Sequence, residues 1–281
     1  MTAALRGLRV GFLERPHPPG YTGGLTERLV PLLACAGAQV EVVQAELGVH
    51  RLDSRPAWDM VVLKSGSAAA LHLAAAAEAW GIPSINGAEP TRLAQDKLAS
   101  AAILQAAGLP IAPGYLIWLG PGVPDLAQRL APLDGGAWVV KAARGSQGVG
   151  LWSVPPGGLL VLAATLPAGP YLLMQHVPHA GDDLKVFVAG SWLSAIERPF
   201  PATTLAAKSG RPAALPDEVA AVVREAGRQL GLTCYGCDFV RGPSGWVLVD
   251  VNAFPGYKGA AEAAPALAAE ISRFAAGGAA R

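Results

Sequence analysis

Residues 1–90 alternate between short β-rich segments and longer segments rich in leucine or alanine. The β-rich segments lie at residues 8–13, 40–43, 59–64 and 83–86, and the helical segments lie at residues 25–36 and 71–80. Strands that alternate with helices usually lie parallel in one sheet, because each connecting helix packs on a face of that sheet. The sequence therefore predicts a small parallel α/β lobe at the start of the chain.

Three more helices are expected in the rest of the chain, at residues 91–107, 217–230 and 260–274. Thr91 is a good N-cap for the first of these helices, and Gly108 stands just past its end. Residues 119–125 and 154–170 are rich in proline and glycine, which predicts loops around a small lid lobe. A chain of 281 residues is long enough for two or three such lobes.

Two aspartates and an asparagine are the strongest candidates for a functional site. Asp238 lies in a strand-like segment, turn-forming residues follow at 241–245, and the expected return strand carries Asp250 and Asn252. Asp250 and Asn252 are two residues apart, so they point to one face of the sheet, and pairing of the strands brings Asp238 close. Two carboxylates and an amide oxygen suit Mg²⁺, which also binds substrate phosphates. The pattern indicates nucleotide phosphoryl chemistry, although the solvated rim of a hairpin has the same pattern.

A glycine-rich loop fits the same chemistry. A β-rich segment ends at Lys141 and leads into the glycine-rich residues 145–150, after which another strand is expected. Glycine lets backbone N–H groups approach phosphate oxygens, and the lysine supplies a cation, whereas a plain hairpin turn would need no lysine there. The loop is neither a Walker loop nor a Rossmann fingerprint, because no helix follows it.

A third segment combines a buried strand with charged residues. Residues 171–177 are expected to form a strand that turns polar at Gln175, where the backbone could pair with the edge of an adenine. Asp183 and Lys185 alternate with apolar residues, which places both on one face of the next strand. An exposed pair of charges on a sheet would give the same alternation.

In this order the motifs resemble the ATP-grasp superfamily, and the resemblance covers most of the chain. The resemblance implies an α/β fold, with an N-terminal parallel lobe followed by two lobes that clasp ATP. The implied domains are an N-terminal α/β domain at residues 1–90, a central lid subdomain at residues 91–176 and a C-terminal catalytic subdomain at residues 177–281. The implied cofactors are ATP and Mg²⁺, with Mn²⁺ as an alternative.

The same resemblance assigns roles to individual residues. Metal binding falls to Asp238, Asp250 and Asn252, with Asp250 in place of a more usual glutamate. Contacts to ATP fall to two phosphate-binding lysines, the glycine loop, the adenine-binding segment and a ribose-binding aspartate: Lys97, Lys141, Gly145, Ser146, Gln147, Gly148, Gly150, Gln175, His176, Val177 and Asp183. For catalysis we expect Arg198 to steady the transferred phosphoryl group, and Lys185 together with Lys258 to hold an acidic substrate.

Two groups within the superfamily compete as the nearest resemblance. Residues 94–97, the glycine loop and Asp183 resemble the RimK-like carboxylate–amine ligases, which phosphorylate a carboxylate and then join it to an amine. Residues 250–259 and Lys185 are closer to the inositol trisphosphate 5/6-kinases. An inositol polyphosphate needs a dense basic pocket, and no basic cluster stands out in the sequence. We therefore favour a ligase of a small-molecule acid and amine, although residues 199–208 lack the loop typical of the glutamate ligases.

Composition excludes several other classes of protein. With 22 Lys+Arg against 21 Asp+Glu, the chain gives no reason to expect nucleic acid or an anionic membrane as a partner. No apolar stretch approaches the length of a membrane span, the first residues lack the core of a signal peptide, and the short pattern Cys234-x-x-Cys237 lacks further zinc ligands. We expect a reduced, cytoplasmic protein, and the oligomeric state stays open, a homo-oligomer included.

Overall fold

The computed structural model describes residues 4–278 except for 19, 21, 145–149, 180, 200–203, 205, 206 and 208. Internal contacts divide the chain into two compact units. Unit 1 comprises Met1–Arg92, Gly181–Asp238 and Asp250–Arg281, and unit 2 comprises Leu93–Ala180 and Phe239–Val249. The three-domain division expected above stays a prediction.

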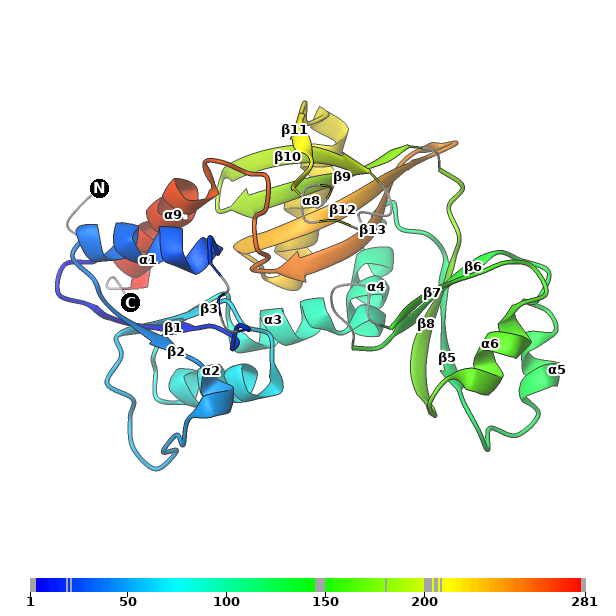
Figure 1. The fold of residues 1–281 in the computed structure, drawn as a ribbon, viewed down its shortest axis with the longest axis horizontal. Coiled ribbons are helices and arrows are strands. Elements are labelled where there is room, and N and C mark those ends of the chain that lie inside the picture. Colours follow the sequence, from blue (N-terminus) through cyan, green and yellow to red (C-terminus); the bar gives the residue numbers. More distant parts are fainter. Residues whose placement is uncertain are drawn as a thin grey trace. The chain divides into compact units, whose positions relative to one another are not determined.

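Unit 1 begins with a four-stranded parallel sheet in the order β2-β1-β3-β4 (Figure 1). The strands are β1 (Arg9–Leu13), β2 (Gln39–Val43), β3 (Met60–Leu63) and β4 (Ser84–Ile85). Two helices, α1 (Leu25–Cys35) and α2 (Ala68–Ala79), follow β1 and β3 in the sequence, and a short 3-10 helix, η1 (Ala45–Leu47), follows β2. The predicted parallel α/β lobe is confirmed.

The two faces of this sheet bury different side chains, as alternation along a strand requires. Val10 and Phe12 of β1 lie in one core cluster together with Leu29 of α1. Leu13 of β1 and Leu71 of α2 lie in the other cluster. Figure 1 shows α1 and α2 on opposite sides of the sheet. Each helix therefore covers one face, and the apolar side chains of β1 and β3 are buried on both.

Unit 1 also contains most of a five-stranded sheet in the order β11-β10-β9-β12-β13. The strands are β9 (Asp182–Ala189), β10 (Trp192–Pro199), β11 (Arg211–Ala213), β12 (Cys234–Gly242) and β13 (Gly245–Ala253). β10 runs antiparallel to both β9 and β11. The predicted helix at 217–230 is confirmed as α8 (Asp217–Leu230), which ends at Gly231 with a left-handed φ of 67°.

The helix expected at 260–274 begins later than the sequence pattern indicates. It is observed as α9 (Ala263–Gly278). The residues before it form a turn that buries Phe254 and Tyr257, whose ring centroids lie 6.2 Å apart. The Tyr257 hydroxyl donates a hydrogen bond of 2.6 Å to the Val188 carbonyl of β9. Ala260, which was expected to be helical, is instead buried in this turn.

A buried asparagine joins the two sheets of unit 1. Asn86 directly follows β4 and is 2% exposed. Its Oδ1 accepts the N–H groups of Thr233 and Cys234 at 2.8 and 2.9 Å, and its Nδ2 donates to the Cys234 carbonyl at 2.6 Å. These bonds hold the end of β4 against the start of β12.

Unit 2 is built on an antiparallel sheet in the order β5-β8-β6-β7. Its strands are β5 (Gly114–Leu119), β6 (Trp138–Ala142), β7 (Leu151–Val154) and β8 (Gly169–Gln175). Two short helices, α5 (Leu126–Leu130) and α6 (Leu159–Thr165), contribute Leu130 and Leu159 to its core. The expectation of a loop at 154–170 is therefore wrong in part, because buried Leu159 and Ala163 stabilise a helix between its proline- and glycine-rich ends.

The helix expected at 91–107 is two helices. They are α3 (Ala88–Gln95) and α4 (Lys97–Ala106), separated by Asp96. Asp96 has an extended backbone, and its Oδ1 accepts the N–H groups of Leu98 and Ala99 at 3.1 and 3.0 Å. Thr91 is not the N-cap, because it lies inside α3 with its hydroxyl buried and without a hydrogen-bond partner among the described residues. Within the part of the chain that is described, no helix is both long and apolar enough to cross a membrane.

Candidate active site

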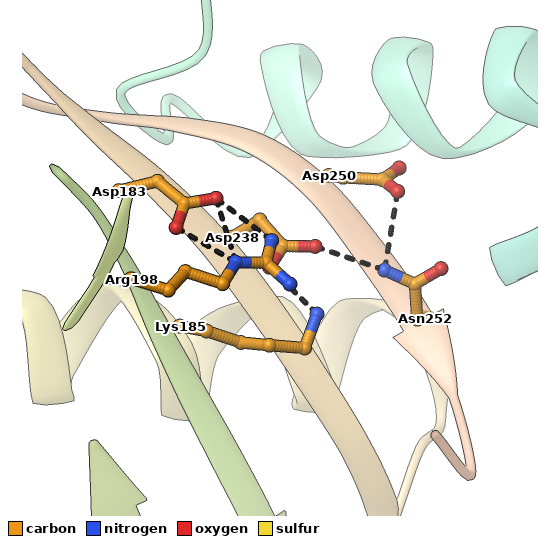
Figure 2. Close-up of polar contacts among 6 residues, drawn as sticks. All are labelled: Asp183, Lys185, Arg198, Asp238, Asp250 and Asn252. Atoms are coloured by element: carbon orange, nitrogen blue, oxygen red, sulfur yellow. Dashed lines mark hydrogen bonds and ion pairs between the residues drawn. The ribbon is translucent and has the colours of Figure 1, made fainter. Parts of the chain in front are cut away.

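Unit 1 contains a network of six polar side chains from four neighbouring strands (Figure 2). β9 contributes Asp183 and Lys185, β10 contributes Arg198, β12 contributes Asp238, and β13 contributes Asp250 and Asn252. β9 and β13 each present two of these residues at positions i and i+2, which lie on one face of a sheet. The sheet therefore gathers on one face six residues that are up to 69 positions apart in the sequence, from Asp183 to Asn252.

Asp238 is at the centre of this network. Its Oδ1 accepts hydrogen bonds from Lys185 Nζ at 2.6 Å and from Arg198 Nη2 at 3.0 Å. Its Oδ2 accepts a bond of 3.1 Å from Asn252 Nδ2, which also donates to Asp250 Oδ2 at 3.1 Å. The predicted convergence of Asp238, Asp250 and Asn252 is confirmed, whereas their role as metal ligands stays a prediction.

Buried Asp183 and partly buried Arg198 form a bidentate ion pair. Arg198 Nε lies 2.7 and 2.9 Å from the two oxygens of Asp183, and Nη2 lies 2.7 Å from Oδ2. Residues 183 and 198 are also register partners in the β9–β10 ladder, which places their side chains directly opposite. The ribose contact expected of Asp183 stays a prediction, and the structure shows both of its oxygens bound to Arg198.

Burial and neighbouring charges have opposite effects on the pKa values of Asp183 and Arg198 in this network. Burial raises the pKa of Asp183, because the charged form is poorly solvated, and its bonds to Arg198 offset this only in part. Burial opposes the charge of Arg198, but its hydrogen bond to Asp183 and the charges of Asp238 and Asp183 outweigh burial and raise the Arg198 pKa. With all groups ionised, three carboxylates face two cations, so the network carries one net negative charge.

The donor set of this network suits a hard cation. Two carboxylates and an amide lie on one sheet face, and the surplus negative charge favours a bound cation. Asn252 now directs its amide nitrogen at both carboxylates, so it would have to rotate about its last torsion to offer oxygen instead. Among the described residues there is no group of three His, Cys, Asp or Glu side chains that could hold a metal ion, so a metal here would depend on the amide and on further oxygen ligands.

Unit 2 carries the two predicted phosphate-binding lysines in neighbouring segments. Lys141, in β6, is 9% exposed, and its Nζ donates a bond of 2.6 Å to the Val249 carbonyl. Lys97 begins α4, and its backbone N–H donates to the carbonyl of Ala143, two residues beyond Lys141. The start of α4 is thereby fixed beside the end of β6, although contact of either lysine with phosphate stays a prediction.

Most of the glycine loop lies outside the described residues, namely Gly145, Ser146, Gln147 and Gly148. Gly150 is described, and it closes the β6–β7 hairpin: its carbonyl accepts the Ala142 N–H at 2.7 Å. Its φ of 79° favours glycine, and a methyl group on its Cα would lie 2.9 Å from the Ala142 Cβ, so no side chain fits at this position. The predicted strand–loop–strand arrangement is confirmed.

The predicted adenine-binding segment begins at Gln175, the last residue of β8. The N–H groups of Gln175 and His176 donate to the carbonyls of Pro113 and Ala137, each at 2.9 Å. The backbone N–H groups of these two residues are therefore already bonded, and a backbone contact with adenine would use their carbonyl groups or the backbone of Val177. His179 faces the Val177 carbonyl, with 2.9 Å between its Nδ1 and that oxygen.

Other residues that the sequence singles out are not members of the network. Lys258 is exposed and is not among the six residues of the network. Cys234 and Cys237 are buried free thiols whose pKa values are raised by burial. The sequence assigns Arg198 to the transferred phosphoryl group and Lys185 to the acidic substrate, but it does not reveal their bonds to Asp238. These bonds depend on β9 lying between β10 and β12, and the sequence carries no local signal for that order.

The fold of this chain is similar to that of several solved structures. A RimK domain ATP-grasp protein from Sphaerobacter thermophilus matches with a TM-score of 0.71 and 20% identity, over 95% of this chain and 99% of that one. The D-alanine-D-alanine ligase from Coxiella burnetii matches with a TM-score of 0.68 and 14% identity, over 96% and 95%. The chain has the ATP-grasp fold. The predicted fold class is confirmed.

Curated relatives of this chain support the predicted resemblance to the RimK-like ligases. A probable alpha-L-glutamate ligase of Thioalkalivibrio sulfidiphilus is 30% identical over 194 residues, which is 65% of this chain and 63% of that relative, so the match spans less than two thirds of its length. A probable alpha-L-glutamate ligase 2 of Shewanella frigidimarina is 26% identical over 90% of both chains. A ribosomal protein bS6--L-glutamate ligase of Salmonella schwarzengrund is 27% identical over 84% of this chain and 81% of that relative. No family model matches the chain, and similarity to the inositol kinases stays a prediction.

Proposed function

We propose that this ATP-grasp protein is an ATP- and Mg²⁺-dependent ligase that joins a carboxylate to an amine. The observation that carries the proposal is the convergence of Asp238, Asp250 and Asn252 on one sheet face, beside Lys185 and Arg198. The names of the curated relatives support the reaction class, since they are glutamate ligases. The acceptor amine is carried by a small molecule or by a protein, and the proposed location is the cytoplasm.

The reaction has two balanced steps. A carboxylate oxygen of the acid attacks the γ-phosphorus of ATP, the bond to the leaving oxygen of ADP breaks, and an acyl phosphate forms. The amine nitrogen then attacks the acyl carbon, phosphate leaves with the bonding electrons, and the amine loses a proton. Both steps depend mainly on positioning and on stabilisation of charge, so no nucleophile from the protein is required.

Each residue of the network has a defined role in this proposal. Asp238, Asp250 and Asn252 would hold Mg²⁺, which neutralises charge on the ATP phosphates when bound. Lys185 and Arg198 hold Oδ1 of Asp238, which leaves Oδ2 facing Asp250 and Asn252. Arg198 and Lys185 also supply positive charge for the transferred phosphoryl group and the acidic substrate.

Residues of unit 2 are assigned to ATP in the same proposal. Lys97 and Lys141 bind its phosphates, and Gly145, Ser146, Gln147, Gly148 and Gly150 cover them. Gln175, His176 and Val177 bind adenine, and Asp183 of unit 1 is the candidate for ribose. The fixed start of α4 beside β6 supports the assignment of the two lysines, because it places them in two neighbouring elements of the unit.

Trapping with hydroxylamine tests the reaction class. The purified protein is incubated with Mg-ATP and pools of amino acids, small acids or inositol phosphates, with hydroxylamine in half of the samples. We expect a hydroxamate that forms only when an acid is present, because hydroxylamine attacks an acyl phosphate. Release of ADP with a polyol phosphate, and without hydroxamate, would contradict the ligase proposal and support a kinase.

Variants of Asp250 test the site within this assay. Asp250→Asn removes a negative oxygen ligand and should lower hydroxamate formation at least a hundredfold, whereas Asp250→Glu should retain a substantial part of the activity. Asp53→Asn, at an exposed ion pair, is the matched control and should leave the rate unchanged. Full activity in Asp250→Asn would show that this carboxylate binds no essential metal.

A further inference from the structure

Strand β5 is an edge strand of the sheet in unit 2, and one side of its backbone is free to pair. Among the described strands it pairs only with β8. The Pro113 carbonyl, directly before β5, accepts the N–H group of Gln175 in β8. Backbone groups alternate in direction along an antiparallel strand, so the N–H and C=O groups of Leu116 and Trp118 point away from β8. These two residues therefore offer hydrogen bonds to a further strand.

Large apolar side chains flank this free edge. Tyr115, Leu116 and Trp118 are 49, 72 and 56% exposed. Leu116 and Trp118 are two residues apart, so they project from one face of the sheet. Tyr115 projects from the other face, where its ring centroid lies 5.7 Å from that of Trp138. An apolar strand with unpaired backbone groups at a sheet edge is a template for pairing with another strand.

Two other edge strands of the chain are protected against such pairing, whereas β5 is not. β11, at the edge of the five-stranded sheet, has three residues, and they include Arg211 and Pro212. β7, at the opposite edge of the sheet in unit 2, is followed by Pro155 and Pro156. Charge, proline and short length are the usual means of preventing pairing at an edge. The six residues of β5 contain neither a charge nor a proline.

The unit that contains β5 is poor in charge. Asp, Glu, Lys and Arg account for 8 of the 99 residues of unit 2, against 35 of the 182 residues of unit 1. No charged residue stands between Lys97 and Asp125 in the sequence, a range that includes the whole of β5. An acidic peptide, a nucleic acid or an anionic membrane would therefore find no complementary charge along this strand. The partner that fits the edge is an uncharged, apolar strand.

A second copy of β5 has these properties and fits the edge under a two-fold axis. Antiparallel pairing can place Leu116 opposite the partner's Trp118, and the symmetry then places Trp118 opposite the partner's Leu116. Both residues have outward backbone groups, so they would form hydrogen-bonded pairs. The Leu–Trp pairs would remove their apolar area from water on one face. A two-fold contact closes on itself, so the pairing ends at two copies and does not extend into a fibre.

The exposed side chains of β5 indicate how strong this pairing is. A large side chain of this kind has about 150–250 Å² to bury, so the exposed parts of Tyr115, Leu116 and Trp118 amount to roughly 300–400 Å² per copy. A standard interface buries about 800 Å² per partner, and smaller ones belong to weak or transient complexes. The dimer should therefore be reversible and depend on concentration.

We propose that β5 is the interface of a homodimer in which the sheets of two copies of unit 2 join edge to edge, with Leu116 of each copy opposite the partner's Trp118. This inference goes beyond the proposed function and does not depend on it. Lys141 lies in β6, and β8 separates β6 from β5. The contact is thus made two strands away from the lysine assigned to ATP.

Sedimentation velocity of the whole chain, from low micromolar to submillimolar concentration, tests the proposal. The parent protein should change from monomer to dimer over this range. Leu116→Lys and Trp118→Glu each bring a charge into an apolar contact, so each should raise the Kd of the dimer about tenfold or more. The double variant Leu116→Lys/Trp118→Glu should recover much of the association, because each lysine would then lie opposite a glutamate of the partner.

Two exposed apolar residues elsewhere in unit 2 are the matched controls. Leu151→Lys changes β7 at the opposite edge of the sheet, and Val161→Lys changes α6. Neither should change the Kd. A parent protein that stays monomeric would overturn the proposal and would leave a strand of another protein as the occupant of the edge. Dimerisation of Leu116→Lys as tight as that of the parent would also overturn it, and a double variant no tighter than the single ones would overturn the register.

Hydrogen exchange of the parent protein tests the same contact without any variant, in case the substitutions prevent folding. The amide hydrogens of Leu116 and Trp118 should be protected at high concentration, because they would bond to the partner's carbonyl groups. Dilution should remove this protection, whereas the amide of Gln175, which is bonded within the chain, should stay protected at both concentrations. Fast exchange of Leu116 and Trp118 in a sample that is largely dimeric would overturn the proposal.

Discussion

Two adjacent aspartates in β9 lie in opposite environments. Asp183 is 3% exposed and binds the partly buried guanidinium of Arg198 through both oxygens. Asp182 points to the other face, where its Oδ2 lies 3.4 Å from Arg211 in an ion pair with side chains 36% and 71% exposed. Solvent screens the exposed pair, whereas loss of one partner of the buried pair leaves a charge without compensation.

These two residues form a matched pair for measuring stability. Asp183→Asn should lower the free energy of unfolding by about 3 kcal/mol, because the partly buried Arg198 would remain with less negative charge around it. Asp182→Asn should lower it by less than about 1 kcal/mol. Urea denaturation of the two variants beside the parent protein measures both values. Equal losses in the two variants would show that the Asp183–Arg198 pair is no more stabilising than a surface pair.

The residues of the site could be foreseen in part from the sequence. The spacing of Asp250 and Asn252 placed both on one face, because side chains alternate along any strand. The bonds of Lys185 and Arg198 to Asp238 could not be foreseen in the same way. They require β9 to lie between β10 and β12, and this order of strands is not encoded in the spacing within any one strand.

At the scale of elements, Asp96 shows how one side chain divides a helical segment. The run from Thr91 to Ala107 has helical composition throughout, and this led to the expectation of a single helix. Aspartate competes with helical backbone bonds through its own side chain and is favoured at an N-cap. In the structure Asp96 has this role at the start of α4, directly before Lys97.

Removal of this cap should destabilise α4. Asp96→Ala loses the two bonds to Leu98 and Ala99, which should lower the free energy of unfolding by about 1 kcal/mol. Asp96→Ser, which retains a capping oxygen, should lower the free energy of unfolding by only a few tenths of a kcal/mol. Chemical denaturation measures both variants. A loss in Asp96→Ser as large as that in Asp96→Ala would mean that the carboxylate acts through its charge or another contact, and not as a cap.

Elements with strong local signals agree with their predicted ranges. α8 begins after Pro216 with two acidic residues in its first turn and ends at a glycine with positive φ, as the sequence indicates. α6 and the start of α9 differ from the prediction, because burial of Leu159 and of Tyr257 decides them. Such burial depends on segments distant in the sequence.

At the scale of the whole molecule, residues assigned to one nucleotide are distributed over two units. Lys97 and Lys141 belong to unit 2, and Asp238, Asp250 and Asn252 belong to unit 1. A ligand that binds the folded state alone raises the free energy of unfolding by mass action, by about 2.7 kcal/mol at a hundred times its Kd. Binding of Mg-ATP should therefore be visible as a shift in thermal unfolding.

The proposed sites predict how this shift responds to mutation and to chelation. Mg-ATP should raise the unfolding midpoint, and excess EDTA should reduce the increase, because the phosphates then lack their cation. Lys141→Met should lose most of the increase, whereas Arg129→Gln, an exposed residue of unit 2, should retain it. Differential scanning calorimetry gives all four values. An increase of the same size in Lys141→Met and in the parent protein would contradict a phosphate contact by Lys141.

The sequence by itself determined the parallel α/β lobe, the β6–β7 hairpin and the shared face of Asp250 and Asn252. These features follow from periodicity and turn chemistry over a few residues, which act wherever the segment lies. Tertiary structure alone decided the Asp183–Arg198 pair, the ion pair of Glu14 and Lys64, and the bonds from Asn86 to Cys234. In each of these, distant residues meet because apolar faces pack together, and the local sequence does not specify which face a segment will meet.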